Sequence, residues 1–150
     1  MPKNSKLIIL GIETSADETS AAVLEAGKEK IRLLSNVIYS QSLVHKKTGG
    51  IVPEMAARAH IPKILPAIKL AVKKSRTSLA AVDCLAVTAG PGLITSLMIG
   101  VDTAKALAFA LKKPVIPINH LEGHLLSSLA GDNSQKIFPA VGLVVSGGHS

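Results

Sequence analysis

Short apolar runs occupy the first third of the chain. Residues 6–14 (KLIILGIET) form an Ile-rich run, and residues 20–26 and 31–41 are two further runs after short polar links. Runs of this length bounded by turn residues are typical of strands. Three strands in hairpin-like succession can be antiparallel. Residues 46–53 (KKTGGIVP) are a predicted loop, because they contain Gly-Gly and Pro.

From Pro53 the apolar positions recur at helical spacing. The stretch from 53 to 75 predicts a helix, although Pro62 and Pro66 inside it predict two helices or one kinked helix. Beyond it the pattern predicts a strand at 81–92, a helix at 94–113, a strand at 114–120, a helix at 121–131, a polar link at 132–136 and a new strand at 138–150.

This order of elements predicts an α/β fold with a mixed sheet. Strands that alternate with helices in the second half imply parallel pairing, with helices on the faces of the sheet. The composition agrees, since 47% of the residues are hydrophobic and 2% are aromatic. The core must therefore consist of Ile, Leu, Val and Ala. A chain of 150 residues has the size of one typical domain.

The formal net charge of +7 favours a polyanionic partner such as nucleic acid, although many proteins of this charge bind none. The low aromatic content argues against a base-stacking platform for single strands. A single cysteine, Cys84, excludes an internal disulfide framework and agrees with a reducing compartment. No apolar run approaches the roughly 20 residues of a membrane span. The N-terminus lacks the features of a secretory signal, so a cytoplasmic location is predicted.

The sequence HLEGH places two histidines, His120 and His124, four residues apart. On a helix this spacing brings two imidazoles to one side, about 6 Å apart, where they can bind one metal ion or remain ordinary surface side chains. A tight site needs a third ligand from elsewhere. Glu122 points away from the shared face, so a base role like that in HExxH is not expected. His45 and His60 have no companion at this spacing and are predicted to be surface or loop residues.

Three other stretches offer candidate chemistry at predicted strand ends. Residues 13–20 (ETSADETS) contain Asp17 and Glu18, which can accept a proton or hold a metal-bound water, unless the stretch is a solvated turn. Residues 88–96 (TAGPGLITS) form a Gly-rich loop that matches no nucleotide-binding motif, which favours a structural turn over a phosphate site. The Gly-Gly pair within 146–150 (SGGHS) permits close approach of a ligand to the backbone.

Taken together, these stretches resemble one family, the tRNA threonylcarbamoyladenosine transferases (TsaD), once described as O-sialoglycoprotein endopeptidases. The matching stretches follow the family's order along nearly the whole chain. They are GIETSADETSAAVL, GGIVPEMAARAHIPKILP, DCLAVTAGPGLITSLMIGVDTAKALA, INHLEGHLLSSL and FPAVGLVVSGGHS. Each is a weak signal by itself, and as a set they are highly specific.

The resemblance implies an actin/Hsp70/sugar-kinase architecture of two RNase-H-like lobes with a ligand between them. Residues 1–132 would then be the first lobe, and residues 133–150 the link and first strand of a second lobe that is otherwise absent. The family's proteins are longer than this chain and take a third metal ligand, an Asp, from the second lobe. We therefore do not expect the 150 residues alone to be active.

The resemblance also implies the activity and its residues. The family transfers the threonylcarbamoyl group from threonylcarbamoyl-adenylate to N6 of adenosine 37 in tRNAs that read codons beginning with A. The positions of His120 and His124 bind one divalent metal ion, usually iron in bacterial members, with zinc and magnesium as alternatives here. Asp17 and Glu18 are the candidate catalytic residues. The substrate contacts would come from Val144, Val145, Ser146, Gly147 and Gly148.

The implied partners are tRNA, threonylcarbamoyl-adenylate and TsaB-like and TsaE-like subunits, with no membrane. In one departure from the family pattern, Ala16 replaces the usual Cys, so any role of that thiol is lost. An alternative function is a catalytically silent scaffold of the same fold within a tRNA-modification complex. A sugar or acetate kinase lobe gives the histidine pair no role, and a metalloprotease would need Glu122 to face bound water.

Overall fold

The computed structural model describes residues 6–28, 30–42, 50–127, 139 and 141–145. Its centre is a five-stranded sheet in the order β3-β2-β1-β4-β5. The strands are β1 (Leu7–Glu13), β2 (Glu18–Ala26), β3 (Ile31–Ser40), β4 (Cys84–Gly90) and β5 (Val115–Asn119). β1, β2 and β3 pair antiparallel, whereas β4 pairs parallel with β1 and with β5. The predicted α/β fold with a mixed sheet is confirmed.

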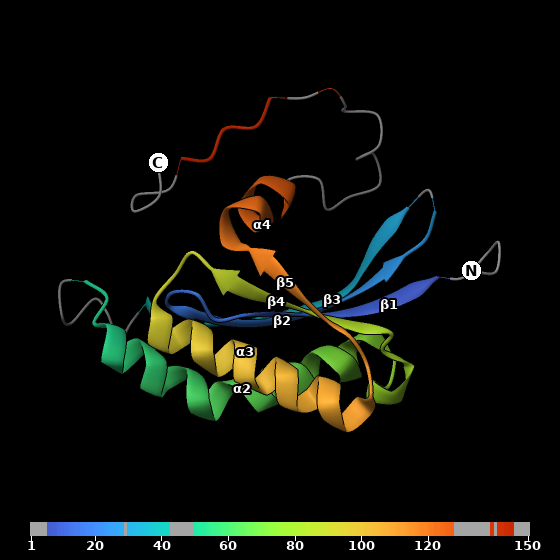
Figure 1. Cartoon of the computed structure of the whole chain (residues 1–150), viewed down its shortest axis with the longest axis horizontal. Helices are drawn as coiled ribbons and strands as arrows, with labels where there is room; N and C mark the ends of the chain where they lie inside the picture. Colours follow the sequence, from blue (N-terminus) through green and yellow to red (C-terminus); the bar gives the residue numbers. More distant parts are fainter. Residues whose placement is uncertain (1–5, 29, 43–49, 128–138, 140, 146–150) are drawn as a thin grey trace.

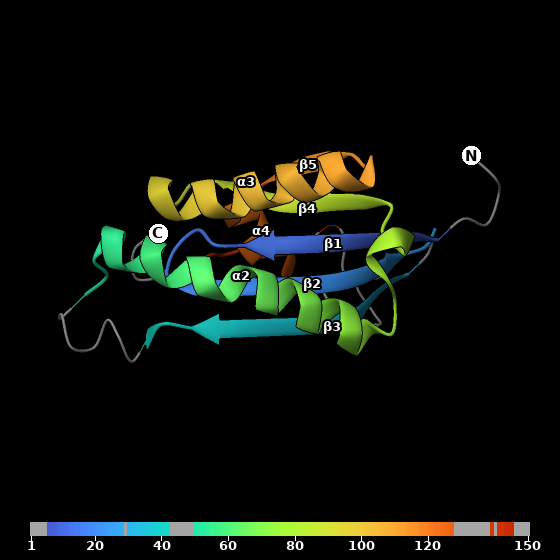
Figure 2. The ribbon, with the colours of Figure 1, turned by 90° about the horizontal axis from the view of Figure 1, so that it is seen from below.

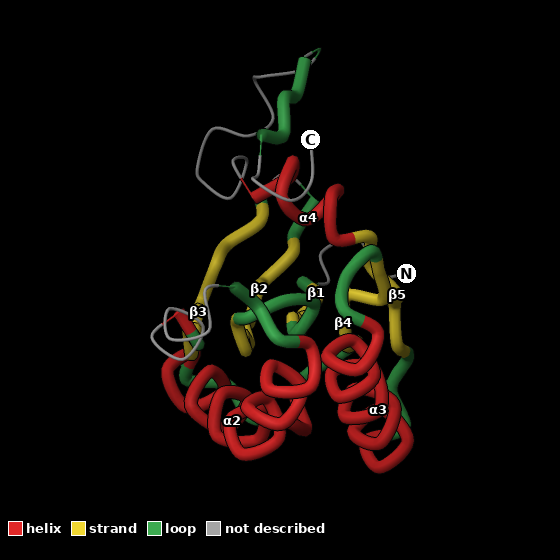
Figure 3. The backbone as a smooth tube through the Cα atoms, turned by 90° about the vertical axis from the view of Figure 1, so that its left-hand side faces the viewer, coloured by secondary structure: helices red, strands yellow, loops and turns green. Residues whose placement is uncertain are grey.

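Two long helices cover one face of the sheet (Figure 1). They are α2 (Pro53–Ser75) and α3 (Ile94–Leu111), and a 3-10 turn at Leu79–Ala81 leads from α2 into β4. The short helix α4 (His120–Ser127) lies on the opposite side, beyond the end of β5 (Figure 3). The carboxyl ends of β1, β4 and β5 therefore meet near α4.

The core lies between the sheet and these two helices, which Figure 2 shows in front of the strands. Aliphatic side chains of the sheet point into it, and alanines on the inner helix faces let the helices approach closely. The buried members are Leu10, Ile12, Ala21, Val23, Val37, Val82, Leu85 and Val87 with Ile64, Ala67, Ile68, Ala71, Ala104 and Ala108. A core without large aromatic rings is what the composition predicts.

The sequence predicts two helices or one kinked helix between residues 53 and 75. The structure instead has one continuous helix, α2, with Pro62 and Pro66 inside it. Both prolines are exposed. The carbonyls that lose their amide partner at a proline therefore lie near solvent, where water can bond to them. Burial of the opposite face through Ile64 and Ile68 then holds the helix together.

By length and composition α3 is the one described helix that could cross a membrane, a feature that the sequence analysis did not predict. The helix packs on β4 and α2, and it buries Leu97, Gly100, Ala104 and Ala108. Contact of one face with a sheet and a neighbouring helix is typical of a helix that covers a core. We therefore treat α3 as part of the core.

Part of the strand predicted at 138–150 lies outside the described residues. Residues 141–145 are described, and they adopt no regular secondary structure. They lie on the far side of α4 from the sheet (Figures 1 and 3), where Gly142 approaches the side chain of Leu125. Within the described residues this stretch has no neighbouring strand, and a strand needs one to satisfy its backbone groups.

The close approach of α3 to the end of β1 generates a first prediction. A methyl group at Gly100 would collide with the Oγ1 of buried Thr14. Gly100→Ala should lower the free energy of unfolding by about 1–2 kcal/mol, because overpacking outweighs the gain in helix propensity. Chemical denaturation measures the change.

The matched control is Gly123→Ala in α4, where an added Cβ would meet nothing within 4 Å. That change should be neutral or stabilise by up to about 1 kcal/mol. If Gly100→Ala were as stable as Gly123→Ala, α3 and β1 would not approach each other as described.

Candidate functional site

A cleft opens where β1, β4 and β5 end beside α4. Its volume is about 590 Å³. Asp17, Glu18, His120 and His124 all line it, so the structure brings together four of the predicted site residues. A position outside the carboxyl ends of parallel strands is where open α/β sheets bind ligands.

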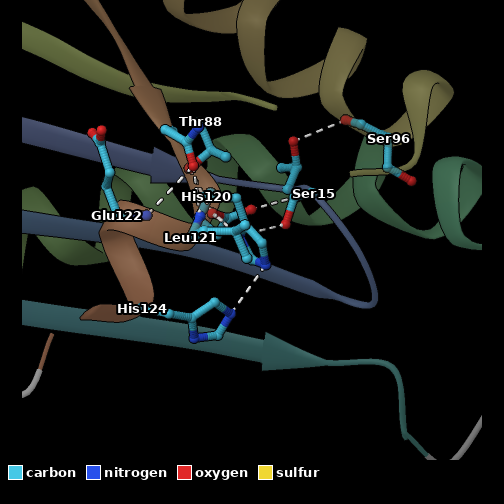
Figure 4. A network of polar contacts seen from close by, with 10 residues as sticks. Ser15, Thr88, Ser96, His120, Leu121, Glu122 and His124 are labelled. Atoms are coloured by element: carbon cyan, nitrogen blue, oxygen red, sulfur yellow. Dashed lines mark hydrogen bonds and ion pairs between the residues drawn. The ribbon is translucent and has the colours of Figure 1, made fainter. Parts of the chain in front are cut away.

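The two histidines come together because β5 runs directly into α4. Asn119, the last residue of β5, accepts hydrogen bonds from the amides of Leu121 (2.9 Å) and Glu122 (3.4 Å), and so caps the helix. His120 and His124 then lie one turn apart. Their Nε2 atoms are 3.0 Å apart and their rings are nearly perpendicular, at 80° (Figure 4).

The other nitrogen of His120 faces a carboxylate. Its Nδ1 lies 3.3 Å from Oε2 of Glu13 and 3.1 Å from Oγ of Ser15. Because an ionised carboxylate only accepts, this contact favours the tautomer with the proton on Nδ1. Nε2 of His120 then presents its lone pair toward His124.

Glu13 also receives hydrogen bonds from the Thr88 hydroxyl, at 2.5 Å, and from the amide of Ser15. Burial would raise the pKa of Glu13, but the hydrogen bonds from Thr88, Ser15 and His120 together hold that pKa below its usual value. The carboxylate therefore stays ionised and bonded to these three residues of the site.

Two imidazole nitrogens 3.0 Å apart fit one divalent ion. Metal–nitrogen bonds of about 2.0–2.1 Å place neighbouring ligand atoms about 3 Å apart. A metal-binding imidazole also usually donates a hydrogen bond from its other ring nitrogen to a carboxylate. Among the described residues no group of three or more His, Cys, Asp or Glu side chains that could hold a metal is found. The pair alone is thus a partial ligand set.

Glu122 is directed away from the two imidazoles (Figure 4), as the sequence predicts. It is also absent from the residues that line the cleft. A protease-type base on bound water would have to reach the metal position. The geometry therefore gives no support to peptide hydrolysis by this residue.

Hydrogen bonds to its backbone carbonyls hold the loop between β1 and β2 against the rest of the protein. The carbonyl of Ser15 accepts from the amide of Leu93 (2.8 Å), and that of Asp17 accepts from the amide of Gln41 (3.0 Å). Between them, the carbonyl of Ala16 lies 3.1 Å from Nε2 of His60. These three hydrogen bonds therefore fix the backbone that carries the side chains of Asp17 and Glu18.

The prediction that His60 is a surface or loop residue is wrong. It lies on the inner face of α2 and is completely buried, at 0% exposed. Its Nδ1 is 2.8 Å from Oγ1 of Thr19. Isolated histidines are usually exposed, but here local partners satisfy both ring nitrogens, which removes most of the cost of burial. His45 lies outside the described residues.

The stretch 88–96 has the structural role that the sequence favours. Gly92 lies against Ser15, since a Cβ there would be 2.7 Å from the Ser15 Cβ. Thr88, from the same stretch, bonds Glu13 as described above. Glu13, Ser15 and Thr88 lie in the candidate stretches 13–20 and 88–96, but none of the three was predicted as a site residue. Only their position at the ends of β1 and β4 could have indicated them.

Five predicted substrate contacts are not placed in the cleft. Val144 and Val145 are described but do not line it, and Val145 is 77% exposed. Ser146, Gly147 and Gly148 lie outside the described residues. The assignment of these five residues stays a prediction.

Comparison with known proteins gives a consistent result. A family model described as tRNA N6-adenosine threonylcarbamoyltransferase matches residues 32–150. A protein of that name from Thermomicrobium roseum is 48% identical over 149 residues, which cover 96% of this chain and 40% of the relative. One from Protochlamydia amoebophila is 46% identical over 144 residues, with 96% and 41% covered. The chain thus spans about 40% of the length of the curated relatives that it matches.

Two solved structures share the fold. YeaZ from Pseudomonas aeruginosa superposes with a TM-score of 0.55 at 23% identity, over 75% of this chain and 44% of the other. An uncharacterized protein with similarity to peptidase YEAZ from Pseudomonas aeruginosa gives 0.55 at 26% identity, over 75% and 43%. Together with the strand order, this likeness confirms the predicted actin/Hsp70/sugar-kinase-like first lobe.

Burial of His60 generates a prediction on pH. Burial lowers the pKa of His60, and Lys63 adds to this, while the bond to Ala16 and the charges of Glu13 and Asp17 oppose it. The unfolded chain therefore binds a proton that the folded chain does not. The free energy of unfolding should be highest above pH 6.5, the ordinary pKa of histidine, and should fall as the pH decreases below it.

Denaturant titrations at several pH values below 6.5, all well above 4.5, the ordinary pKa of a glutamate, would measure this slope before the carboxylates titrate. His60→Gln should reduce the slope, because the variant has no imidazole to protonate. An equal slope in both proteins would mean that His60 is not buried in its neutral form.

Proposed function

The chain belongs to the tRNA N6-adenosine threonylcarbamoyltransferase family, and we propose that it supplies the metal-binding half of such an enzyme. The reaction is transfer of the threonylcarbamoyl group from threonylcarbamoyl-adenylate to N6 of adenosine 37 in tRNAs reading ANN codons. The observation that supports it is the His120–His124 pair, with Nε2 atoms 3.0 Å apart, in one cleft with Asp17 and Glu18.

Within that proposal residues 1–132 are the first lobe and residues 133–150 lead into a second. The chain spans about 40% of the length of its relatives. A second lobe would close the cleft on the side where α4 and residues 141–145 lie. It would also supply the third metal ligand, since the described residues offer two at the cleft. We place the complete protein in the cytoplasm, where tRNA is modified.

The proposed metal is iron, with zinc or magnesium as alternatives. Bound by His120 and His124, it would supply Lewis-acid polarisation and a fixed orientation for the substrate. The residues around the histidine pair fix its geometry before a metal ion binds. Glu13 keeps the proton of His120 on Nδ1, away from the ligand position, and Asn119 fixes the start of α4. Preorganisation of this kind lowers the cost of binding in the correct geometry.

Asp17 or Glu18 is proposed to assist the attacking amine. The adenosine N6 attacks the carbonyl carbon of the threonylcarbamoyl group, the bond from that carbon to the phosphate oxygen breaks, and AMP leaves. The amine loses one proton in this step, and a carboxylate in the cleft can orient the amine and accept that proton. The backbone of Ser146–Gly148 is proposed to hold the phosphate.

The proposed partners are tRNA and TsaB-like and TsaE-like subunits. The net charge of +7 suits a tRNA backbone. A protein surface is offered by the apolar groove between α2 and α3, which is separate from the cleft. It is lined by Ile61, Ile64, Leu65, Ile99, Thr103, Ala106 and Leu107. Exposed apolar surface of this kind marks protein interfaces.

Metal binding by the complete protein, which includes the proposed third ligand, is the first test. Dialysis against iron, zinc or magnesium, followed by elemental analysis, should give about one ion per chain for the wild type. The variant His120→Ala/His124→Ala should bind none, because both nitrogen ligands are gone.

The matched control is Glu122→Gln, a change on the same helix turn directed away from the pair (Figure 4), which should bind as the wild type does. Stoichiometric metal in the double variant would refute the ligand role of the pair. Absence of metal from the wild type would leave the lobe as a scaffold rather than half of an active site.

The proton acceptor is identified by transfer assays on the complete protein, with mass spectrometry of the tRNA nucleosides. Asp17→Asn or Glu18→Gln should lower kcat by about 10²–10⁴-fold at unchanged metal content, as expected for loss of a general base. Full activity in both single variants would remove these carboxylates from the mechanism.

A further inference from the structure

His60 lies beneath the cleft, under the loop that joins β1 and β2. It is completely buried and is not among the residues that line the cleft. Its polar contacts are nevertheless to groups of this loop or beside it: Ala16, Thr19 and Gln41. A histidine in this position can affect the chemistry of the cleft only through the groups that it holds.

The hydrogen bonds of His60 define one neutral tautomer. The carbonyl oxygen of Ala16, 3.1 Å from Nε2, can only accept, so Nε2 bears the proton. Nδ1 is then an acceptor for the Thr19 hydroxyl at 2.8 Å, and for the side-chain amide of Gln41 at 3.4 Å. Lowering of the His60 pKa by burial agrees with a neutral ring.

The bond to Ala16 sets the direction of a whole peptide unit. The cis peptide among the described residues is Gly90–Pro91, so the Ala16–Asp17 peptide is trans. In a trans peptide the carbonyl and the amide N–H point in opposite directions. Since the carbonyl of Ala16 points down to His60, the N–H of Asp17 points away from His60 and toward the cleft side of the loop.

Three consecutive carbonyls of this loop accept hydrogen bonds from the body of the protein. Those of Ser15 and Asp17 accept from the backbone amides of Leu93 and Gln41. The carbonyl of Ala16, between them, accepts from the side chain of His60. Of these three hydrogen bonds, the one from His60 is therefore the one that a side-chain substitution can remove. Its loss would free the peptide that precedes Asp17.

We propose that His60 is a positioning residue of the cleft, which fixes the Ala16–Asp17 peptide and thereby the placement of Asp17 relative to His120 and His124. The catalytic consequence rests on the proposed transferase function, whereas the structural part does not. A misplacement of about 1 Å at a reacting group can lower a rate by about 100-fold. His60 is thus required for turnover without touching the substrate.

The structural part is tested by NMR on the 150-residue chain. Ring nitrogen shifts of the wild type should show His60 as the neutral tautomer protonated on Nε2. His60→Leu removes the donor at similar volume, while the Nε2–H of Gln in His60→Gln can still reach the Ala16 carbonyl. The amide shift and hydrogen exchange of Asp17 should change in His60→Leu and stay near wild type in His60→Gln.

The matched control is Ser35→Ala. The buried Ser35 hydroxyl donates to the carbonyl of Ala71, at 2.7 Å, and so links β3 to the same helix, α2. Its removal should lower stability with no effect on the Asp17 amide. If the Asp17 amide responded equally to Ser35→Ala and to His60→Leu, a general loosening of α2 would explain the effect, and the proposal would be overturned.

The catalytic part is tested in the complete protein. His60→Leu should lower kcat by about 100-fold with KM for tRNA and metal content unchanged, and His60→Gln should recover most of the loss. Ser35→Ala should transfer at the wild-type rate. Wild-type kcat in His60→Leu would overturn the positioning role.

The two proposals fail in different ways. If the wild type transfers nothing, the transferase function is wrong, and the NMR comparison still decides whether His60 fixes the loop. An Nδ1-protonated or charged His60 in the wild-type chain would overturn the proposal even if transfer is observed.

Discussion

The carboxylate of Glu13 joins the segments that make up the cleft. It stands at the last residue of β1 and bonds Ser15 in the following loop, Thr88 at the end of β4, and His120 at the start of α4. These groups are up to 107 positions apart in sequence, so only the parallel pairing of β1, β4 and β5 brings them to one edge. The geometry of the histidine pair depends on this carboxylate.

The loop that carries Asp17 is fixed from two sides. Glu13 bonds it from the cleft side through Ser15, while His60 and the backbone amides of Leu93 and Gln41 bond its carbonyls from the core side. Both supports are largely buried, where a hydrogen bond left unmade is costly. The chain therefore offers a rigid set of polar groups before any ligand arrives, which is the usual requirement of a site that must hold a metal and a substrate together.

The elements were predictable because their patterns are simple. Apolar runs identified all five strands, and helical periodicity identified the long helices. The continuity of α2 was not predictable, because it depends on which face Pro62 and Pro66 occupy. The His120–His124 pair was visible from spacing alone. Glu13 was not, because its role depends on strands paired far apart in sequence, and His60 was misjudged because its partners lie across the core.

The central claim is that Nε2 of His120 and Nε2 of His124 bind one divalent metal ion on this lobe. X-ray absorption at the metal edge of the loaded complete protein tests it most directly, because imidazole ligands give a characteristic scattering pattern. The account predicts two imidazole nitrogens at about 2.0–2.1 Å from the metal. A spectrum with oxygen ligands only would contradict it.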